Sequence, residues 1–335
     1  MDRKIKIAVD AMGGENSPNK IIAGIKLILK DNENLYFNLF GKSEVINNLI
    51  NDNDLIKEKC QIIDSELKIE DHESPLQAAK KSNKSSMWQA INSVKNNESQ
   101  IALSAGNTGA LLILSKMILE MIKGIDKPAL AGLWPNKKGM NIVLDLGANI
   151  VCSDKNLIDF TYMGSSLYKS LFPDVMPKIA ILNVGSEEIK GHDEIKKAYK
   201  FLKENKINDF EFMGYVEGNH ITEGKVNVIV TDGFTGNIAL KTAEGTANFV
   251  TNILKESLNR TFYSRIIMFL NYINFKKFKD KLDPRKYNGA IFLGLNGPIV
   301  KSHGATDSFG FANSIKMCKK IVEGNLIEKI KRNLN

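Results

Sequence analysis

The sequence contains few of the side chains that build disulfide frameworks and metal centres. Three cysteines occur in 335 residues, Cys60, Cys152 and Cys318, and they lie too far apart to form a CxxC pair. The four histidines show no HExxH or HxxxH spacing. We therefore expect no disulfide framework and no zinc or other metal site, and the composition fits a reducing cytoplasm.

Long hydrophobic runs are missing as well. No apolar stretch approaches the roughly 18–20 residues that a membrane-spanning helix requires. Residues Met1–Lys4 lead into a short strand-like run rather than the apolar centre of a signal peptide. No segment rich in Gly, Pro and Ser divides the chain. We therefore expect a cytoplasmic protein with a single domain over residues 1–335.

The overall composition is that of a soluble globular protein, with 43% hydrophobic and 25% charged residues. The formal net charge is +8. This excess is compatible with nucleic acid, an anionic membrane, an acidic protein partner or a phosphate-bearing substrate. The general abundance of lysine, asparagine and isoleucine explains the charge equally well, so charge alone selects none of these partners.

Short β-branched runs alternate with longer helical patterns, which predicts an α/β fold: a three-layer αβα sandwich around a mostly parallel central sheet. The predicted strands are Lys4–Val9, Tyr36–Phe40, Gln61–Ile63, Ile101–Ser104, Ala129–Leu133, Asn141–Asp145, Lys178–Asn183, Phe210–Met213, Val226–Thr231 and Ile299–Lys301. The predicted helices are Asn19–Leu29, Val45–Ile50, Pro75–Asn96, Thr108–Met121, Leu157–Leu171, Asp193–Glu204, Thr235–Leu258 and Asp307–Gly324.

Residues 255–283 have a different pattern, in which apolar side chains at helical spacing are surrounded by basic ones. The pattern predicts a protruding, basic amphipathic helical insertion, suited to an anionic membrane surface or a partner groove. A packed surface helix or a dimer-interface helix is the alternative. The residues expected to contact a membrane are Phe262, Ile266, Phe269, Leu270 and Ile273.

Five segments share one motif, in which an apolar strand ends in a glycine-containing polar turn. They are residues 9–14, 104–109, 144–149, 182–191 and 232–237. The carboxyl ends of parallel strands lie at one edge of a sheet, and backbone N–H groups at a helix N-terminus bind anions. The motif therefore predicts one shared anion-binding cleft. It matches neither the GxGxxG dinucleotide pattern nor the GxxxxGK[ST] nucleotide loop.

Three side chains near these turns are candidates for chemistry. Lys190 supplies a fixed positive charge that Glu187 and Glu188 could orient, and Asn237 can donate from its amide. His303 could hold phosphate or pass a proton. A solvated helix start, an ordinary first-turn residue and a structural histidine are the respective alternatives.

Three aspartates also lie at strand ends. Asp10, Asp145 and Asp232 could bind a metal, but helix capping and turn formation explain each of them without one. We therefore expect no metal.

Seven segments, in order along nearly the whole chain, resemble the bacterial phosphate acyltransferases of the PlsX family. They are Asp-Ala-Met-Gly-Gly at 10–14, Ser-Ala-Gly-Asn-Thr-Gly-Ala at 104–110, Leu-Asp-Leu-Gly-Ala-Asn at 144–149, Asn-Val-Gly-Ser-Glu-Glu-Ile-Lys-Gly at 183–191, Asp-Gly-Phe-Thr-Gly-Asn at 232–237, Leu-Gly-Leu-Asn-Gly at 293–297 and His-Gly at 303–304. The chain departs from the family pattern at Glu15, at Asn219-His220 and at Asn288, so no site role is carried over to Asn219 or His220.

The resemblance implies an αβα fold like that of isocitrate and isopropylmalate dehydrogenases, in a homodimer related to phosphotransacetylases. It implies transfer of a long-chain acyl group from acyl-acyl carrier protein to orthophosphate, without a cofactor. The acyl-phosphate would feed a glycerol-3-phosphate acyltransferase in phospholipid synthesis. The protein would associate peripherally with the inner face of the cell membrane and bind no nucleic acid.

The glycine-turn pattern and the resemblance together lead to a hypothesis for the site residues. Lys190, Asn237 and His303 would be catalytic, and phosphate or substrate would contact Gly13, Gly14, Asn107, Thr108, Asp232 and Gly236. Three other functions stay open: a short-chain phosphotransacetylase acting on acyl-coenzyme A, a nicotinamide-dependent decarboxylating dehydrogenase, and a non-catalytic carrier- or membrane-binding protein.

Overall fold

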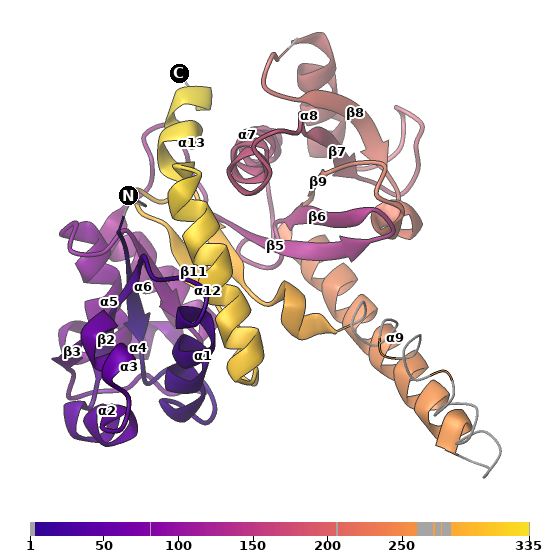
Figure 1. The fold of residues 1–335 in the computed structure, drawn as a ribbon. Helices are drawn as coiled ribbons and strands as arrows, with labels where there is room; N and C mark the ends of the chain where they lie inside the picture. Colours follow the sequence, from indigo (N-terminus) through magenta and orange to yellow (C-terminus); the bar gives the residue numbers. More distant parts are fainter. Residues whose placement is uncertain are drawn as a thin grey trace.

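The computed structural model describes residues 4–80, 82–205, 207–259, 271, 276 and 283–334. In this part of the chain one sheet of eleven strands has the order β3-β2-β1-β4-β11-β10-β5-β6-β9-β7-β8 (Figure 1). The strands are β1 (Ile5–Asp10), β2 (Leu35–Gly41), β3 (Cys60–Asp64), β4 (Ile101–Ser104), β5 (Ala129–Asn136), β6 (Gly139–Leu144), β7 (Lys178–Leu182), β8 (Glu211–Val216), β9 (Val228–Val230), β10 (Ala290–Leu293) and β11 (Ile299–Lys301).

Helices cover both faces of this sheet. They are α1 (Asn19–Leu29), α2 (Ser43–Ile50), α3 (Asp54–Lys59), α4 (Pro75–Lys80), α5 (Ser86–Lys95), α6 (Thr108–Leu119), α7 (Asp154–Leu171), α8 (Asp193–Glu204), α9 (Gly233–Asn259), α12 (Ser308–Glu323) and α13 (Leu326–Leu334). Three short 3-10 turns, Ser82–Lys84, Gly218–Glu223 and Pro284–Tyr287, complete the described elements.

The layering follows from the alternation of apolar side chains along each strand. In β7, Ile179 and Ile181 face one hydrophobic cluster, while Ala180 and Leu182 face another. The first cluster packs under α1, α7 and α12, and the opposite face is covered by α5 and α6 in one half of the sheet and by the first turns of α9 in the other. The predicted αβα sandwich is therefore confirmed.

The sheet consists of two parallel halves that run in opposite directions. Strands β3, β2, β1, β4 and β11 are parallel to one another, and so are β6, β9, β7 and β8. Between them, the pairings β11–β10, β10–β5 and β5–β6 are antiparallel, so the direction reverses three times. The prediction that all five glycine turns share one edge is therefore wrong: they form two groups, one in each half.

One predicted helix is wrong and several short elements were missed. The expected helix Pro75–Asn96 is divided into α4 and α5, because Ser85 caps a new helix by accepting a hydrogen bond from Trp88 N at 3.2 Å. The strand β10 and the helices α3 and α13 were not predicted. Each has fewer than ten residues, too few for a hydrophobic period to stand out.

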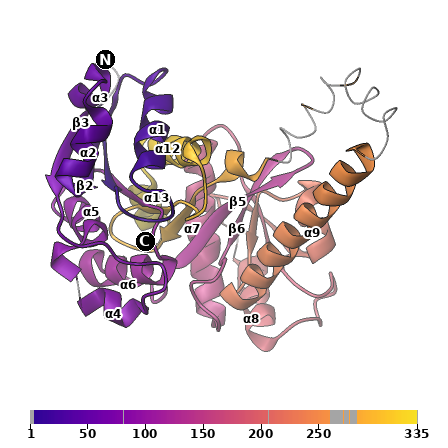
Figure 2. The same ribbon diagram turned by 90° about the horizontal axis from the view of Figure 1, so that it is seen from below.

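Helix α9 is the element that leaves the body of the molecule (Figures 1 and 2). Ala239, Leu240 and Ala243 pack against the sheet, whereas Phe249 and Ile253, farther along, are 64% and 47% exposed. The five apolar residues expected to contact a membrane, from Phe262 to Ile273, lie outside the described residues. In the described part of the chain, no helix combines the length and the hydropathy that crossing a membrane requires.

Candidate functional site

The first group of glycine turns surrounds the buried carboxylate of Asp10, at the end of β1. Its two oxygens accept hydrogen bonds of 2.6 Å each from Ser86 Oγ and Ser104 Oγ. Burial raises the pKa of Asp10, and these hydroxyl donors oppose that rise. A Cβ atom added to Gly13 would lie 2.5 Å from Asp10 Oδ2 and 2.7 Å from Gly106 N, so the turns after β1 and β4 are packed backbone to backbone.

Two lysines enter this group from other elements. Lys20, on α1, donates to the carbonyl of Gly304, and Lys301, the last residue of β11, donates to the carbonyl of Ala105 at 3.4 Å. Gly14 has a φ of +80°, and a Cβ atom there would lie 3.0 Å from Lys20 Nζ. Gly14 therefore both turns the chain and leaves room for the ammonium.

The second group lies at the ends of β6 and β9 and is built around Asp145. This carboxylate accepts from the backbone N–H groups of Leu130, Gly147, Ala148 and Asn149 at 2.8–3.1 Å. The Asn149 side chain also donates to Asp145 Oδ2 at 2.7 Å. Asp145 is thus a structural centre that fixes the turn following β6.

Helix α9 begins on this turn. Asp232 caps it by accepting from Thr235 N and Thr235 Oγ1, each at 2.8 Å. A Cβ atom on Gly236 would lie 1.9 Å from the Asp145 carbonyl oxygen, so the helix contacts the turn through bare backbone. This contact places the side chain of Asn237 beside Gly147, at 3.5–3.7 Å from the position a Cβ atom would take there.

Lys190 lies in the loop that follows β7, the strand next to β9. The amide of the mostly buried Asn183 donates to the Lys190 carbonyl at 3.1 Å, which fixes the loop, while the Lys190 residue itself is exposed. The expectation that Glu188 orients Lys190 is wrong, because Glu188 accepts from Tyr199 Oη at 2.8 Å and pairs with Lys203. Glu187 and Lys190 do lie together, over Gly185.

The side chain of Asn107 is used inside the protein. Its Oδ1 caps α6 by accepting from Ala110 N at 3.0 Å, and its Nδ2 donates to the carbonyls of Asp71 and Glu73 at 2.9 Å each. The expected role of Asn107 as a substrate donor is therefore replaced by a positioning role for the loop that holds Asp71. Thr108, the first residue of α6, is exposed at the helix N-terminus.

His303 connects the two halves of the site. Partial burial lowers its pKa, and the positive charge of Lys301 lowers it further. Lys241 and Glu244, on α9, act on the same ring with opposite signs. Since Lys301 belongs to the first group and α9 starts in the second, His303 lies within electrostatic range of both.

His303 is held by one contact of its backbone and one of its ring. Its backbone N–H donates to Asn288 Oδ1 at 3.0 Å, and its Nδ1 accepts from Ala305 N at 3.2 Å. The neutral ring therefore carries its hydrogen on Nε2 and presents it as a donor. Asn288 also donates to Ser302 Oγ at 2.9 Å, so this departure from the family pattern supports the loop.

These contacts predict a pH effect on stability. The folded state holds the pKa of His303 below the unfolded value near 6.5, so the unfolded state binds more protons between the two values. The contribution of His303 is therefore complete above pH 6.5 and is lost as the pH falls through the folded pKa. We expect His303→Gln to flatten the pH dependence of the urea unfolding free energy between pH 7.5 and 5.5. An unchanged slope of the unfolding free energy against pH would contradict the lowered pKa of His303 in the folded state.

One cysteine lies close to the second group of turns. Cys152, beside the Asp145 turn, is buried, and burial raises its pKa to about 11, so it stays a thiol at neutral pH. Among the residues that the structure describes, no three His, Cys, Asp or Glu side chains cluster as metal ligands.

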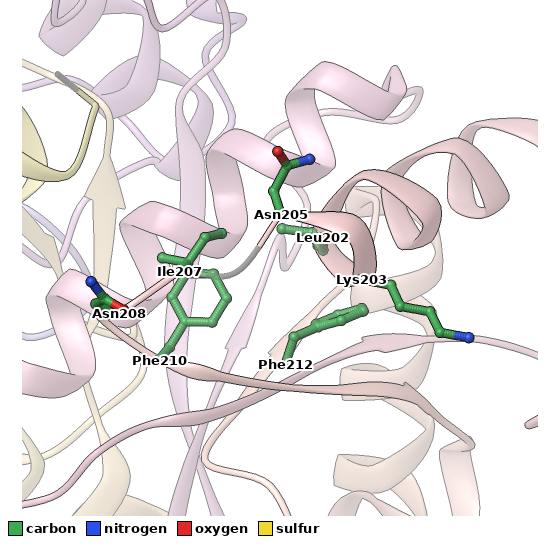
Figure 3. A pocket seen from close by; sticks show the side chains of 7 residues that line it. All are labelled: Leu202, Lys203, Asn205, Ile207, Asn208, Phe210 and Phe212. Carbon is green, nitrogen blue, oxygen red and sulfur yellow. The ribbon is translucent and has the colours of Figure 1, made fainter.

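A hollow of about 320 Å³ lies elsewhere, between α8 and β8 (Figure 3). It is found at the amino end of β8, on the opposite edge of the sheet from Lys190. Its lining residues are Leu202, Lys203, Asn205, Ile207, Asn208, Phe210 and Phe212.

The structure thus brings Gly13 and Gly14 together in one group, and Asp232, Gly236 and Asn237 in another. The sequence reasoning missed Lys20 and Lys301. A signal for Lys301 existed, because it directly precedes the Ser-His-Gly segment that was singled out. Lys20 carried no such signal, since it lies in an ordinary helical pattern.

The sequence comparison decides the family. The family described as "Fatty acid synthesis protein" matches residues 5–329. A relative from Pelagibacter ubique named "Phosphate acyltransferase" is 58% identical over 334 residues, which is 100% of both chains. The chain belongs to this phosphate acyltransferase family. It is an acyltransferase, and the resemblance to the PlsX family is confirmed.

Solved structures agree on the fold of this acyltransferase. A phosphotransacetylase from Streptococcus pyogenes matches with a TM-score of 0.63 and 15% identity, over 97% of this chain and 94% of the other. A 4-hydroxythreonine-4-phosphate dehydrogenase from Klebsiella pneumoniae matches with a TM-score of 0.54 and 14% identity, over 96% and 99%. At such identities the match is evidence for a shared fold alone.

Proposed function

We propose that the protein transfers a long-chain acyl group from acyl-acyl carrier protein to orthophosphate. The observation that carries the long-chain donor is a rim of exposed apolar side chains around the strand ends that hold Lys190 and Asn237. Six large apolar residues in the loops after β6 and β7 and at the start of α9 are 50–81% exposed: Ile150, Val151, Val184, Ile189, Phe234 and Ile238. Contact with an acyl chain would remove this exposed apolar surface from water, which is favourable.

The reaction needs no protein nucleophile, because an oxygen of orthophosphate attacks the thioester carbonyl carbon. The carbon–sulfur bond then breaks, leaving acyl-phosphate and the thiolate of the carrier, which takes up a proton. The amide of Asn237 and the ammonium of Lys190 would stabilise the negative charge of the tetrahedral intermediate. The proton comes from the hydrogen phosphate that becomes acylated, and His303, neutral with its hydrogen on Nε2, would donate a hydrogen bond to the phosphate or to the leaving sulfur.

The carrier, the membrane and the second subunit belong to the same proposal. Acyl carrier protein is acidic, and the net charge of +8 favours its approach. The exposed apolar residues of α9 and the basic amphipathic pattern of residues 255–283 support a homodimer and peripheral membrane contact, where acyl-phosphate would pass to a glycerol-3-phosphate acyltransferase. A solution mass of twice 37.3 kDa and co-sedimentation with anionic vesicles are the expected results.

Acyl-phosphate trapping tests the reaction. Purified protein with palmitoyl-acyl carrier protein and orthophosphate should yield palmitoyl hydroxamate when hydroxylamine is added, and the yield should fall to background without orthophosphate. Turnover of acetyl-coenzyme A without turnover of the acylated carrier would instead assign a short-chain phosphotransacetylase. Absence of product from both donors would leave only a binding role.

Asn237 is the most direct test of the oxyanion assignment. Asn237→Ala is expected to reduce kcat about 100-fold, because one preorganised donor to the oxyanion is lost. The KM of both substrates should change little, since the interaction forms in the transition state. Asn252→Ala, exposed on the same helix, is the matched control and should keep normal kcat. Equal kcat values in the two variants would refute the role.

A further inference from the structure

Two lysines in the first group of turns, Lys20, which is buried, and Lys301, which is half-buried, form no ion pair with a carboxylate in the described part of the chain. Lys20 is only 4% exposed, and its ammonium donates to the carbonyl of Gly304. The ammonium of Lys301 donates to the carbonyls of Ser302 and Ala105. Within the described part of the chain, neither ammonium lies within 4.0 Å of a carboxylate.

The positive charges of these two lysines are not neutralised by a carboxylate in direct contact. Removing a cation from water is costly unless an opposite charge compensates it, and carbonyl dipoles carry no net charge. Burial lowers the pKa of Lys20, and it lowers the pKa of Lys301 to about 8. The positive charge of Lys20 lowers the pKa of Lys301 further, while Asp71 and Asp10 raise it from a distance. Glu15 and Asp71 likewise raise the pKa of Lys20, and Lys68 lowers it. The two ammonium groups therefore favour an additional anion beside them.

The buried acid Asp10 supplies little of that charge, because it acts on Lys301 only from a distance. Asp10 is held by the hydroxyls of Ser86 and Ser104, and burial raises its pKa. Its hydrogen bonds point into the sheet edge rather than to either ammonium. Glu15 and Asp71, both exposed, raise the pKa of Lys20 without forming an ion pair with it, so an anion from outside the chain would add the negative charge that direct contact lacks.

The ammonium groups and one helix N-terminus are the parts of these surroundings that suit a small oxyanion. A Cβ atom on Gly14 would lie 2.8 Å from Ala105 O and 3.0 Å from both Gly304 O and Lys20 Nζ, so an anion would have to meet the ammonium groups on the side away from these two carbonyl oxygens. Helix α6 begins three residues after Ala105, and its first N–H groups add partial positive charge. Backbone without side chains lets a ligand approach closely.

We propose that Lys20 and Lys301 bind the phosphate that accepts the acyl group. The chemistry is that of a tetrahedral oxyanion with two negative charges, and its identity as the acceptor rests on the proposed function. Lys190 and Asn237, in the other half, would then contact the acyl donor. His303, two residues after Lys301, lies between the two substrates.

Substitution of Lys301 distinguishes the two phosphate groups that could bind here, free orthophosphate and the phosphodiester of the acyl carrier. Lys301→Met is expected to raise the KM for orthophosphate at least about 10-fold and to leave the KM for the acyl donor within about twofold. Lys301→Arg, which keeps the charge, should recover most of the affinity. Lys316→Met, an exposed lysine on α12, is the matched control and should behave as wild type. A raised donor KM with unchanged orthophosphate KM would place the carrier's phosphodiester here and overturn the assignment.

Wild-type protein provides a test that does not depend on any variant folding. Calorimetric binding of orthophosphate, without acyl donor, should weaken about 10-fold between pH 7.0 and 9.5 as Lys301, whose pKa is lowered to about 8, loses its proton. Phosphate itself becomes more fully dianionic over this range, so constant or rising affinity would overturn the inference. Orthophosphate binding that depends on Lys301 in a protein that forms no acyl-phosphate would uphold the site and refute only the proposed function.

Discussion

Lys190→Ala is expected to lower kcat by about 100- to 1000-fold, the loss seen when one preorganised donor to a developing oxyanion is removed. The loop that carries Lys190 is held by the amide of Asn183, which donates to the Lys190 carbonyl rather than to its side chain. The side chain is exposed, so its removal leaves no cavity. The fold and the thermal midpoint should therefore stay close to wild type.

The control for this prediction lies on the neighbouring helix. Lys197→Ala removes an exposed lysine from α8 and should leave kcat unchanged. Steady-state kinetics with acylated carrier and orthophosphate measure both variants. Near-wild-type turnover of Lys190→Ala would show that Lys190 takes no part in the reaction. Asn237 would then be the remaining proposed donor that stabilises the negative charge of the intermediate.

Gly236→Ala is expected to produce the largest loss of stability, about 3 kcal/mol or more of unfolding free energy. The added methyl group would lie 1.9 Å from the Asp145 carbonyl oxygen. Neither partner can yield easily, because Asp145 is fixed by its hydrogen bonds to Gly147, Ala148 and Asn149. The first turn of α9 must then shift, and Asn237 would shift with it, so activity should fall together with stability.

The same helix offers a matched control. Gly245→Ala adds the same methyl group where no atom lies within 4 Å, so it should stabilise the protein by about 0.5–1 kcal/mol through helix propensity. Urea unfolding curves of the two variants measure the difference directly. Equal stability of Gly236→Ala and wild type would mean that the close contact between α9 and the Asp145 turn is absent in solution.

Much of the site was predictable because its elements are local. Asp232 and Asn107 cap helices within four residues of their own positions, and the strands alternate apolar side chains over a few residues. The seven family segments are equally local, and they identified the family from the sequence alone. Interactions of this kind join residues that are close together in the sequence, so they do not depend on how distant segments pair.

The sequence by itself determined the α/β class, the family and the glycine turns that carry Asn237 and Lys190. Only the tertiary structure decided which turns meet. Three antiparallel pairings at β11, β10, β5 and β6 reverse the sheet and divide the turns into two groups. Lys20 meets the carbonyl of Gly304, 284 residues away, only because α1 and the loop after β11 pack at the same sheet edge. The pairing of distant segments depends on packing and burial of the whole chain, so it cannot be deduced from the spacing of residues along the sequence.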